Sequence, residues 1–391
     1  MRLTHLHLSR FRNYDSLEWA PAPGLTVLFG ANAQGKSNLL EAVAFLSLAR
    51  SPRAASDRET IAWSALTETE PVARLVGRIE KRGGPLEIEI AVRALQEGQP
   101  AAAESVVQKR IRVNGVALRA SELVGQLAVA IFSPEDIELV IGSPSQRRRF
   151  LDMTISQVDR RYLRALQRYQ RVVLQRNHLL RRLSEGAARP EELEYWDHEL
   201  AQNGATLIVR RRASVAQLAA EATVAHARLS GGGEAFTLVY REAWGPNGTA
   251  PPAGADEIEV ARALGVALAL GLPRDTKAGA TLLGPHRDDL LFFLNDRALA
   301  SFGSRGQQRS AVLALRLAEA RYLEASTGEA PVILLDDALS ELDLARRCFV
   351  MELAASREQA LVTVSEPGMV PAAFRERATL LEVHRGSLSP A

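Results

Sequence analysis

The chain has 391 residues, of which 47% are hydrophobic and 24% charged, and its 48 basic and 46 acidic residues leave a net charge of +2. These proportions are those of a globular protein of about two or three domains, and any surface for nucleic acid must come from local charge patterning. The single cysteine, Cys348, excludes an intramolecular disulfide framework and suits a reducing cytoplasm. The longest apolar stretch, near Ala263 to Leu272, is too short to span a bilayer, and the start lacks the apolar core of a signal peptide. We therefore expect a cytoplasmic chain without a membrane partner.

The first third of the sequence predicts strands and a phosphate-binding loop. Strands are expected near Leu3 to Leu8, Leu25 to Phe29, Val72 to Ile79, Leu86 to Val92 and Ile111 to Val113. The segment from Gln96 to Ser105 is rich in Ala, Glu and Gln and is expected to be an exposed loop. Residues 1–150 are thus interpreted as the first half of a nucleotide-binding domain.

The phosphate-binding loop directly follows the second of these strands. The apolar stretch is followed by the motif Gly-x-x-x-x-Gly-Lys-Ser, and a helical pattern begins at Asn38. Its glycines allow backbone N–H groups to point at phosphate oxygens, the lysine supplies a positive charge, and the serine hydroxyl is a ligand for Mg²⁺. The alternative is a glycine turn in some other α/β unit. The predicted nucleotide-binding residues are Gly30, Ala31, Asn32, Ala33, Gln34, Gly35, Lys36 and Ser37.

An arginine-rich segment lies in the middle of the chain, which we interpret as a mostly helical arm domain of residues 151–270. Between Arg147 and Arg182 there are eleven arginines and only two acidic residues. Apolar residues spaced three and four apart predict a helix, and Arg176 interrupts this apolar pattern. A helix-breaking segment from Ser184 to Pro190 then precedes a second predicted helix. The pattern predicts an antiparallel helical hairpin with a basic first arm, which is either a DNA-binding surface or a solvated charged face. The candidate DNA contacts are Arg161, Arg164, Arg168 and Arg171.

Three further motifs follow in the range 271–391, interpreted as the second half of the nucleotide-binding domain. Ser304, Gly306 and Gln307 open a helical pattern; such a turn is either an anion site or a plain helix cap. An apolar run, typical of a buried strand, then ends in Asp336 and Asp337. Carboxylates at the end of such a strand either hold Mg²⁺ beside a nucleotide or only cap a turn. The segment from Ser340 to Asp343 comes next.

The order of these motifs resembles that of the ABC-type ATPases that manage DNA ends and chromosomes, including the SMC proteins. The chain more closely resembles the RecF family of bacterial DNA replication and repair proteins. The matching segments span the chain: Phe11–Tyr14, Gly30–Glu41, Phe132–Asp136, Gly142–Asp152, Gly284–Asp289, Gly306–Arg309 and Leu334–Asp343. The implied fold is α/β, an ABC-type P-loop ATPase head split by a mostly helical arm domain.

The resemblance also implies a mechanism. ATP and Mg²⁺ would bind through the phosphate loop, Ser37 and Asp336, with Lys36, Asp336 and Asp337 as the catalytic residues. Ser304, Gly306 and Gln307 of a second protomer would face the γ-phosphate, so that ATP drives a homodimer that closes on DNA. Because the second carboxylate is Asp337 rather than a longer glutamate, we expect slow hydrolysis that DNA stimulates. No residue is assigned to the switch loop near Leu361 to Ser365, and His286 is expected to make a structural hydrogen bond.

The implied biological role is recombinational repair and replication restart. RecF proteins bind single-stranded, gapped and duplex DNA, act with RecO and RecR, help to load RecA at gaps, and support the SOS response. Two alternatives remain open at this point: an ABC transporter ATPase subunit, and a non-catalytic SMC-like scaffold in which ATP is only structural.

Overall fold

The computed structural model describes residues 1–94, 107–246, 248–340 and 342–391. The chain divides into two compact units: unit 1 comprises Met1–Asp136 with Glu319–Ala391, and unit 2 comprises Ile137–Ala318. The loop expected from Gln96 to Ser105 and Glu341 of the Ser340–Asp343 segment lie outside the described residues.

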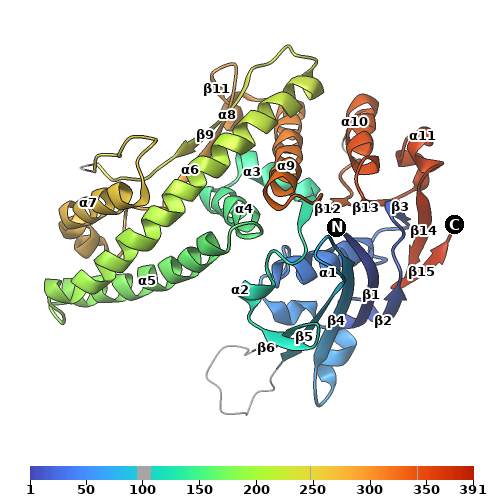
Figure 1. Cartoon of the computed structure of the whole chain (residues 1–391), viewed down its shortest axis with the longest axis horizontal. Coiled ribbons are helices and arrows are strands. Elements are labelled where there is room, and N and C mark those ends of the chain that lie inside the picture. Colours follow the sequence, from blue (N-terminus) through green and yellow to red (C-terminus); the bar gives the residue numbers. More distant parts are fainter. Residues whose placement is uncertain (95–106, 247, 341) are drawn as a thin grey trace. The chain divides into compact units, whose positions relative to one another are not determined.

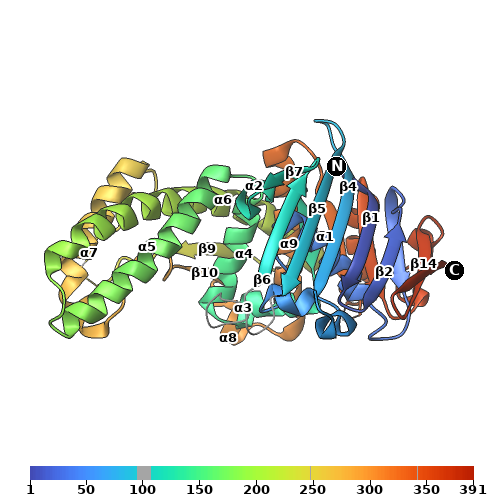
Figure 2. The same cartoon turned by 90° about the horizontal axis from the view of Figure 1, so that it is seen from below.

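Unit 1 contains an antiparallel sheet, whose strands lie side by side in Figure 2. Its spatial order is β2-β1-β4-β5-β6-β7. A register shift between Leu3 and His5 alters the alternation of β1, so that Leu3, Leu6 and Leu8 are all buried. The strands are β1 (Arg2–Phe11), β2 (Tyr14–Trp19), β4 (Val72–Glu80), β5 (Leu86–Ala94), β6 (Val107–Val113) and β7 (Val116–Leu118).

The second sheet of unit 1 joins the two ends of the sequence. Its order is β15-β14-β3-β13-β12-β8, and all neighbours are parallel except the β14–β15 pair. Strands β12 and β13 are buried along their whole length, as expected for a parallel sheet covered on both faces. The strands are β3 (Gly24–Phe29), β8 (Val129–Phe132), β12 (Val332–Asp336), β13 (Gln359–Val364), β14 (Thr379–His384) and β15 (Ser387–Pro390).

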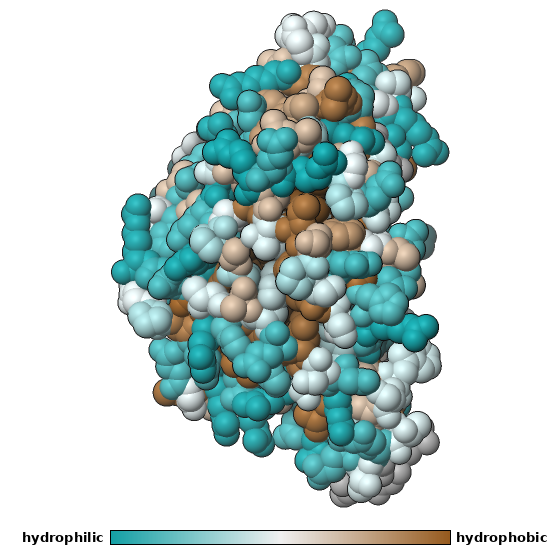
Figure 3. All heavy atoms as spheres, turned by 90° about the vertical axis from the view of Figure 1, so that its right-hand side faces the viewer, coloured by the Kyte–Doolittle hydropathy of each residue, from teal (hydrophilic) through white to brown (hydrophobic). Residues whose placement is uncertain are grey.

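Helix α1 (Lys36–Leu48) contacts strands of both sheets, which explains why nearly all of its residues are buried. The other helices of unit 1 are α2 (Ala120–Leu123), α10 (Leu344–Ala355) and α11 (Ala372–Arg375). The side of unit 1 that carries β14 and β15 is mostly hydrophilic, with hydrophobic atoms in narrow strips (Figure 3). Edge strand β15 is four residues long and ends in exposed Pro390, which lacks a backbone N–H; both features discourage pairing with another chain.

Unit 2 is built on a helical hairpin. Helices α5 (Arg160–Ser184) and α6 (Glu194–Ser230) run antiparallel, and α7 (Glu257–Ala278) packs on both (Figure 1). Strands β9 (Phe236–Arg241), β10 (Asp289–Leu294) and β11 (Arg297–Ala298) form a small antiparallel sheet in the order β11-β10-β9. The remaining helices are α3 (Glu138–Ile141), α4 (Pro144–Ser156), α8 (Leu299–Phe302) and α9 (Arg305–Thr327); α9 crosses the boundary between the units.

The five early strands, the β12 strand and the helical hairpin are confirmed at their predicted places. The compact units, however, have different limits from the predicted ranges 1–150, 151–270 and 271–391. The predicted limit at residue 270 falls inside unit 2 because β9 and β10, from two different predicted ranges, pair along their full length. As functional domains, the three ranges stay a prediction.

Arg176 interrupts the apolar pattern of α5 because it is a buried ionic residue of unit 2. Its side chain is fully buried, and its guanidinium lies 2.6 Å from both Asp197 and Asp275 and donates to Thr281. Arg176 thus occupies a core position of α5 and joins α5 to α6 and α7 by ion pairs. Among the helices that the structure describes, none is long and apolar enough to cross a membrane.

Candidate functional site

The loop from Gly30 to Ser37 joins β3 to α1 in a strained conformation. Gly30 and Gly35 have φ of 143° and 114°, and even Ala33 is left-handed at 64°. A Cβ at Gly30 would lie 2.5 Å from the carbonyl oxygen of Val383, so only glycine fits there. Backbone strain of this kind is common where a loop is shaped for a ligand.

The ammonium of Lys36 lies over this loop. It donates hydrogen bonds to the carbonyl oxygens of Gly30, at 2.5 Å, and Ala31, at 2.8 Å. Burial lowers the pKa of Lys36, while the negative charges of Asp337 and Asp336 act in the opposite direction. The predicted cation therefore lies at the loop and interacts with both predicted carboxylates.

The structure brings Ser37 and Asp336 together from opposite ends of the sequence. The Ser37 hydroxyl donates to Oδ1 of Asp336 at 2.6 Å. A hydroxyl and a carboxylate oxygen that converge in this way are the hard ligands that Mg²⁺ prefers. The residues present therefore fit a magnesium ion held by Ser37 and Asp336.

Two residues that the sequence analysis did not single out complete this carboxylate environment. Thr363 on β13 donates to Oδ1 of Asp336 at 2.9 Å and accepts from the backbone N–H of Asp337 at 2.8 Å. The guanidinium of Arg53 lies 3.6 Å from Asp336. Thr363 thereby holds the carboxylate of Asp336 and the backbone of Asp337, and Asp337 itself has a left-handed φ of 47°.

The phosphate loop is braced from two hairpins. From the β1–β2 hairpin, Asn13 in the turn donates to the Gln34 carbonyl at 3.0 Å, and buried Tyr14 at the start of β2 donates its hydroxyl to the Gly35 carbonyl at 2.9 Å. From the β14–β15 turn, the N–H of Arg385 donates to the Gln34 side chain, and that of Gly386 to the Gln34 carbonyl. Three backbone or side-chain groups therefore hold Gln34 in place.

The segment Ser304–Gln307 lies in unit 2, at the start of α9. The N–H of Gln307 donates to Ser304 Oγ at 3.2 Å, and the N–H of Ser304 donates to Gln307 Oε1 at 2.8 Å. This reciprocal pair is a capping box. Ser304 and Gly306 are exposed. A helix start of this kind can bind an anion through the hydroxyl and free N–H groups.

The arginine-rich segment separates into structural and exposed residues. Arg147 and Arg176 are buried in ion pairs, and Arg148 is half-buried and donates to the Asp288 carbonyl. The remaining arginines are exposed: Arg149, Arg160, Arg161, Arg164, Arg168, Arg171, Arg181 and Arg182.

The four candidate DNA contacts on α5 differ in their partners. Arg161 pairs with Glu257 and Arg168 with Glu199, each at 2.5 Å. Arg164 and Arg171 have no carboxylate partner among the residues that the structure describes, and Arg171 donates only to the Gln167 carbonyl. Being seven residues apart, these two arginines lie on one face of α5. That face is the part of the hairpin best suited to phosphate.

His286 makes the structural hydrogen bonds expected of it. Its Nε2 lies 3.0 Å from the Thr281 carbonyl, and its Nδ1 lies 2.7 Å from the Tyr169 hydroxyl. Because a carbonyl can only accept, Nε2 carries the proton and Nδ1 accepts from Tyr169. Burial lowers the pKa of His286 to about 4, so the ring is neutral near pH 7.

Comparison with known proteins identifies the chain. A model of the RecF/RecN/SMC N-terminal domain family matches residues 2–387. The DNA replication and repair protein RecF of Roseiflexus castenholzii is 43% identical, with 100% of both chains covered. The chain belongs to the RecF family.

Solved structures support this membership at the level of the fold. A structure of RecF–ATP, the recombination mediator protein of the RecFOR pathway, matches with a TM-score of 0.86 and 30% identity over 100% of this chain and 97% of the other. An Smc head domain from Pyrococcus yayanosii matches with a TM-score of 0.53 and 14% identity, over 100% and 96%, and shares the fold alone. The predicted α/β head fold of RecF and SMC proteins is therefore confirmed.

Within this RecF family member, the sequence analysis missed Asn13, Tyr14, Arg53, Thr363, Arg385 and Gly386 as supports of the candidate site. Asn13 and Tyr14 belong to a segment that was matched to the RecF family without a role. Gly386 carried a local signal, because glycine often follows a strand in a tight hairpin. Thr363 carried none, since its role depends on a strand pairing that local patterns do not predict.

Proposed function

We propose that this protein is a DNA-binding ATPase of recombinational repair and replication restart. The observation that carries the proposal is the 2.6 Å contact between Ser37 and Asp336, which assembles a site with the oxygen ligands required by Mg²⁺ bound with ATP. Bound Mg²⁺ supplies charge stabilisation for phosphoryl transfer. Support for ATP also comes from the related RecF–ATP structure.

The residues of unit 1 have distinct roles in this proposal. Backbone N–H groups of Gly30–Ser37 bind the phosphates, and Lys36 neutralises their charge. Asp336 holds the metal with Ser37, and Asp337 orients the attacking water. Because aspartate is one methylene shorter than glutamate, Asp337 reaches the water less well, and hydrolysis is slow until DNA stimulates it.

Unit 2 supplies the second half of each composite site in a homodimer. Ser304, Gly306 and Gln307 of the partner face the γ-phosphate, so ATP favours the dimer and hydrolysis releases it. The exposure of Ser304 and Gly306 at the start of α9 supports this assignment. The exposed arginines of α5 bind DNA phosphates, with Arg164 and Arg171 making the main contacts and Arg161 and Arg168 weaker ones.

The biological setting of the proposal follows from the relatives. The Roseiflexus relative is named a DNA replication and repair protein, and the related structure is assigned to the RecFOR pathway. We extend this to cytoplasmic action with RecO and RecR on single-stranded, gapped and duplex DNA, RecA loading at gaps, and the SOS response. Membership of the RecF family favours this role over the transporter alternative.

The first test measures binding to gapped duplex DNA with ATP, with ADP and without nucleotide, at matched salt. Tight binding that requires ATP, together with a dimer in sedimentation with a non-hydrolysable ATP analogue, is the expected result. A persistent monomer contradicts the dimer mechanism. Equal DNA affinity in all three conditions would mean that DNA binding does not depend on the nucleotide.

A second test addresses the non-catalytic scaffold alternative. Lys36→Arg keeps a positive charge but misplaces it, so ATP should still bind while hydrolysis is lost. If recombinational repair in cells survives Lys36→Arg unchanged, turnover is dispensable and the scaffold alternative is correct.

A further inference from the structure

The side-chain amide of Gln307 is held between two partners within unit 2. Its Oε1 accepts from the N–H of Ser304 at 2.8 Å, and its Nε2 donates to Oε1 of Glu234 at 2.7 Å. An ionised carboxylate can only accept hydrogen bonds. Glu234 therefore selects the amide orientation in which oxygen, not nitrogen, faces Ser304.

This orientation matters for the start of α9. If the amide were reversed, two donors would face each other at Ser304, and the capping box would be lost. The N–H of Gln307 also donates to Ser304 Oγ, so the hydroxyl is oriented by the same cap. Glu234 thus acts on the geometry of Ser304 without reaching any ligand itself.

Glu234 is positioned by the carboxyl-terminal end of the long helix α6. Its Oε2 lies 3.7 Å from Nε2 of His226, which is fully buried in α6 and stacks on Phe236 with ring centroids 5.0 Å apart. The neighbouring residue Ala235 exchanges hydrogen bonds with Asn295, each at 2.9 Å. The Glu234 carboxylate therefore lies beside the end of α6, and the backbone of the next residue is held to the turn that follows β10.

We propose that Glu234 is a positioning residue that links α6 to the ATP-facing turn Ser304–Gln307. This inference rests on the proposed function, because that turn is taken to face the γ-phosphate in a partner protomer. Since α6 packs along the arginine-bearing helix α5, a shift of α6 when DNA binds is transmitted through Glu234 to Gln307. Glu234 contributes to dimer formation and to DNA stimulation of hydrolysis, and not to nucleotide binding by one protomer.

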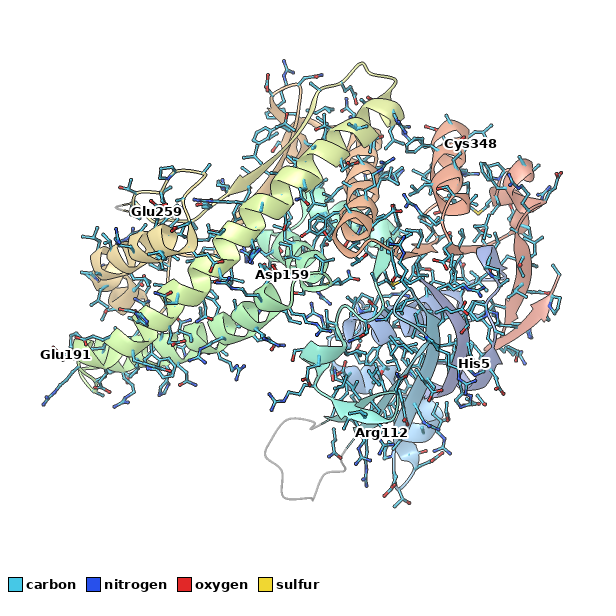
Figure 4. The ribbon with its side chains drawn as sticks, in the orientation of Figure 1. His5, Arg112, Asp159, Glu191, Glu259 and Cys348 are labelled. Atoms are coloured by element: carbon cyan, nitrogen blue, oxygen red, sulfur yellow. The ribbon has the colours of Figure 1, made fainter. Side chains whose placement is uncertain are left out.

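The test uses the full chain with four single substitutions, at Glu234 (two), Glu191 and Gln307, and one double substitution. Glu234→Ala removes the acceptor, and Glu234→Gln restores it, because a glutamine oxygen can still accept from Gln307. Glu191→Ala is the matched control: Glu191 is an exposed glutamate at the tip of the helical hairpin, whereas Asp159 marks the opposite end of α5 (Figure 4). Helix α6 begins at Glu194, so about 50 Å of helix separates the control from the His226 end.

Two measurements, of dimer affinity and of nucleotide affinity, give the outcome. Glu234→Ala should weaken the dimer formed with a non-hydrolysable ATP analogue by about 10-fold or more, while the affinity of the monomer for a fluorescent ATP analogue changes by less than about 2-fold. Glu234→Gln should recover most of the dimer affinity, and Glu191→Ala should match the wild type. A double substitution with Gln307→Ala should be no worse than Gln307→Ala alone.

Amide hydrogen exchange separates this inference from the proposed function. In the monomer, Glu234→Ala should raise the exchange of the Ser304–Gln308 amides whether or not a dimer exists. A wild-type protein that never dimerises overturns the proposed function but leaves this measurement informative. Unchanged exchange, an unaffected dimer, or additive effects of Glu234→Ala and Gln307→Ala overturn the role of Glu234.

Discussion

The hydroxyl of Ser37 donates to the carboxylate of Asp336 across 2.6 Å, although 299 residues separate them in the sequence. The contact is formed because β3 and β12 both flank β13 in one parallel sheet and end at the same edge. Carboxyl-terminal edges of such sheets are where ligands bind. The pair therefore provides a direct target for substitution.

Asp336→Asn should abolish most ATP hydrolysis while preserving the fold. The asparagine oxygen can still accept from Ser37 and Thr363, but the negative charge that holds Mg²⁺ is gone. Metal stabilisation is worth several kcal/mol, so we expect turnover to fall roughly 100-fold or more. Steady-state phosphate release checks this. Asp15→Asn, at an exposed position of β2, is the control, and near-normal turnover of Asp336→Asn would refute the metal assignment.

Gly386→Ala should weaken binding of both ATP and ADP. Gly386 has a φ of 76°, and a Cβ there would lie 2.7 Å from the Asn13 carbonyl oxygen. The strain, on the order of 1–3 kcal/mol, moves the turn away from Gln34, so we expect roughly a 10-fold loss of nucleotide affinity. Equilibrium titration with fluorescent nucleotides measures it.

Ser389→Ala is the control for that substitution, because Ser389 is exposed on the same hairpin but makes no contact with the phosphate loop in the described structure. If the nucleotide affinities of Gly386→Ala and Ser389→Ala were equal, the contact between the β14–β15 turn and Gln34 would be unnecessary for nucleotide binding.

The double substitution Arg164→Ala/Arg171→Ala should weaken DNA binding more than the loss of two positive charges elsewhere on the protein does. Neither arginine is paired with a carboxylate among the described residues, so both are free to replace counterions on phosphate. If both contact duplex phosphates, the slope of log affinity against log salt should fall by about 1.8. Fluorescence anisotropy at several salt concentrations gives the slope.

Arg74→Ala/Arg78→Ala removes the same charge from exposed positions of β4, where each arginine pairs with a glutamate of β5. This control should leave the slope close to that of the wild type. Equal losses in the two double variants would mean that net charge, and not the face of α5, governs affinity.

Acid should destabilise unit 2 through His286. Its pKa is lowered to about 4 in the fold from an ordinary value of 6.5, so the unfolded chain binds the extra proton first as pH falls. Stability from this group is present above pH 6.5 and is lost between about 6.5 and 4, by roughly 3 kcal/mol at most.

Chemical denaturation between pH 7.5 and 4 measures this loss. His286→Gln cannot titrate and should flatten that part of the profile, although it also lowers stability at neutral pH. An unchanged acid slope in His286→Gln would show that other groups cause the acid sensitivity.

Local patterns predicted much of the fold. The Gly-Lys-Ser loop, the apolar run ending at Asp336 and the three-and-four spacing of α5 each report a feature that neighbouring residues determine. The limits of the compact units were not predictable in this way, because they depend on the pairing of β9 with β10 across about 50 residues.

The residues that support the candidate site could not be predicted from local sequence patterns either. Thr363, Gly386 and Glu234 act through contacts with residues far away in the sequence, and each looks ordinary among its own neighbours. Arg176 shows the same limit: local patterns marked it only as an interruption among the arginines of α5, and its burial against Asp197 and Asp275 makes it a structural residue.

The interleaving of the two units also has a consequence for biosynthesis. Strand β3 and its phosphate loop emerge early from the ribosome, but the strands that flank β3, β13 and β14, begin only at Gln359 and Thr379. Residues 137–318 are complete before either strand exists, so unit 2 can fold while β3 still lacks both neighbours. Closing contacts over more than 300 residues is slow, so we expect competence to bind nucleotide to arise only after β13 and β14 have been synthesised.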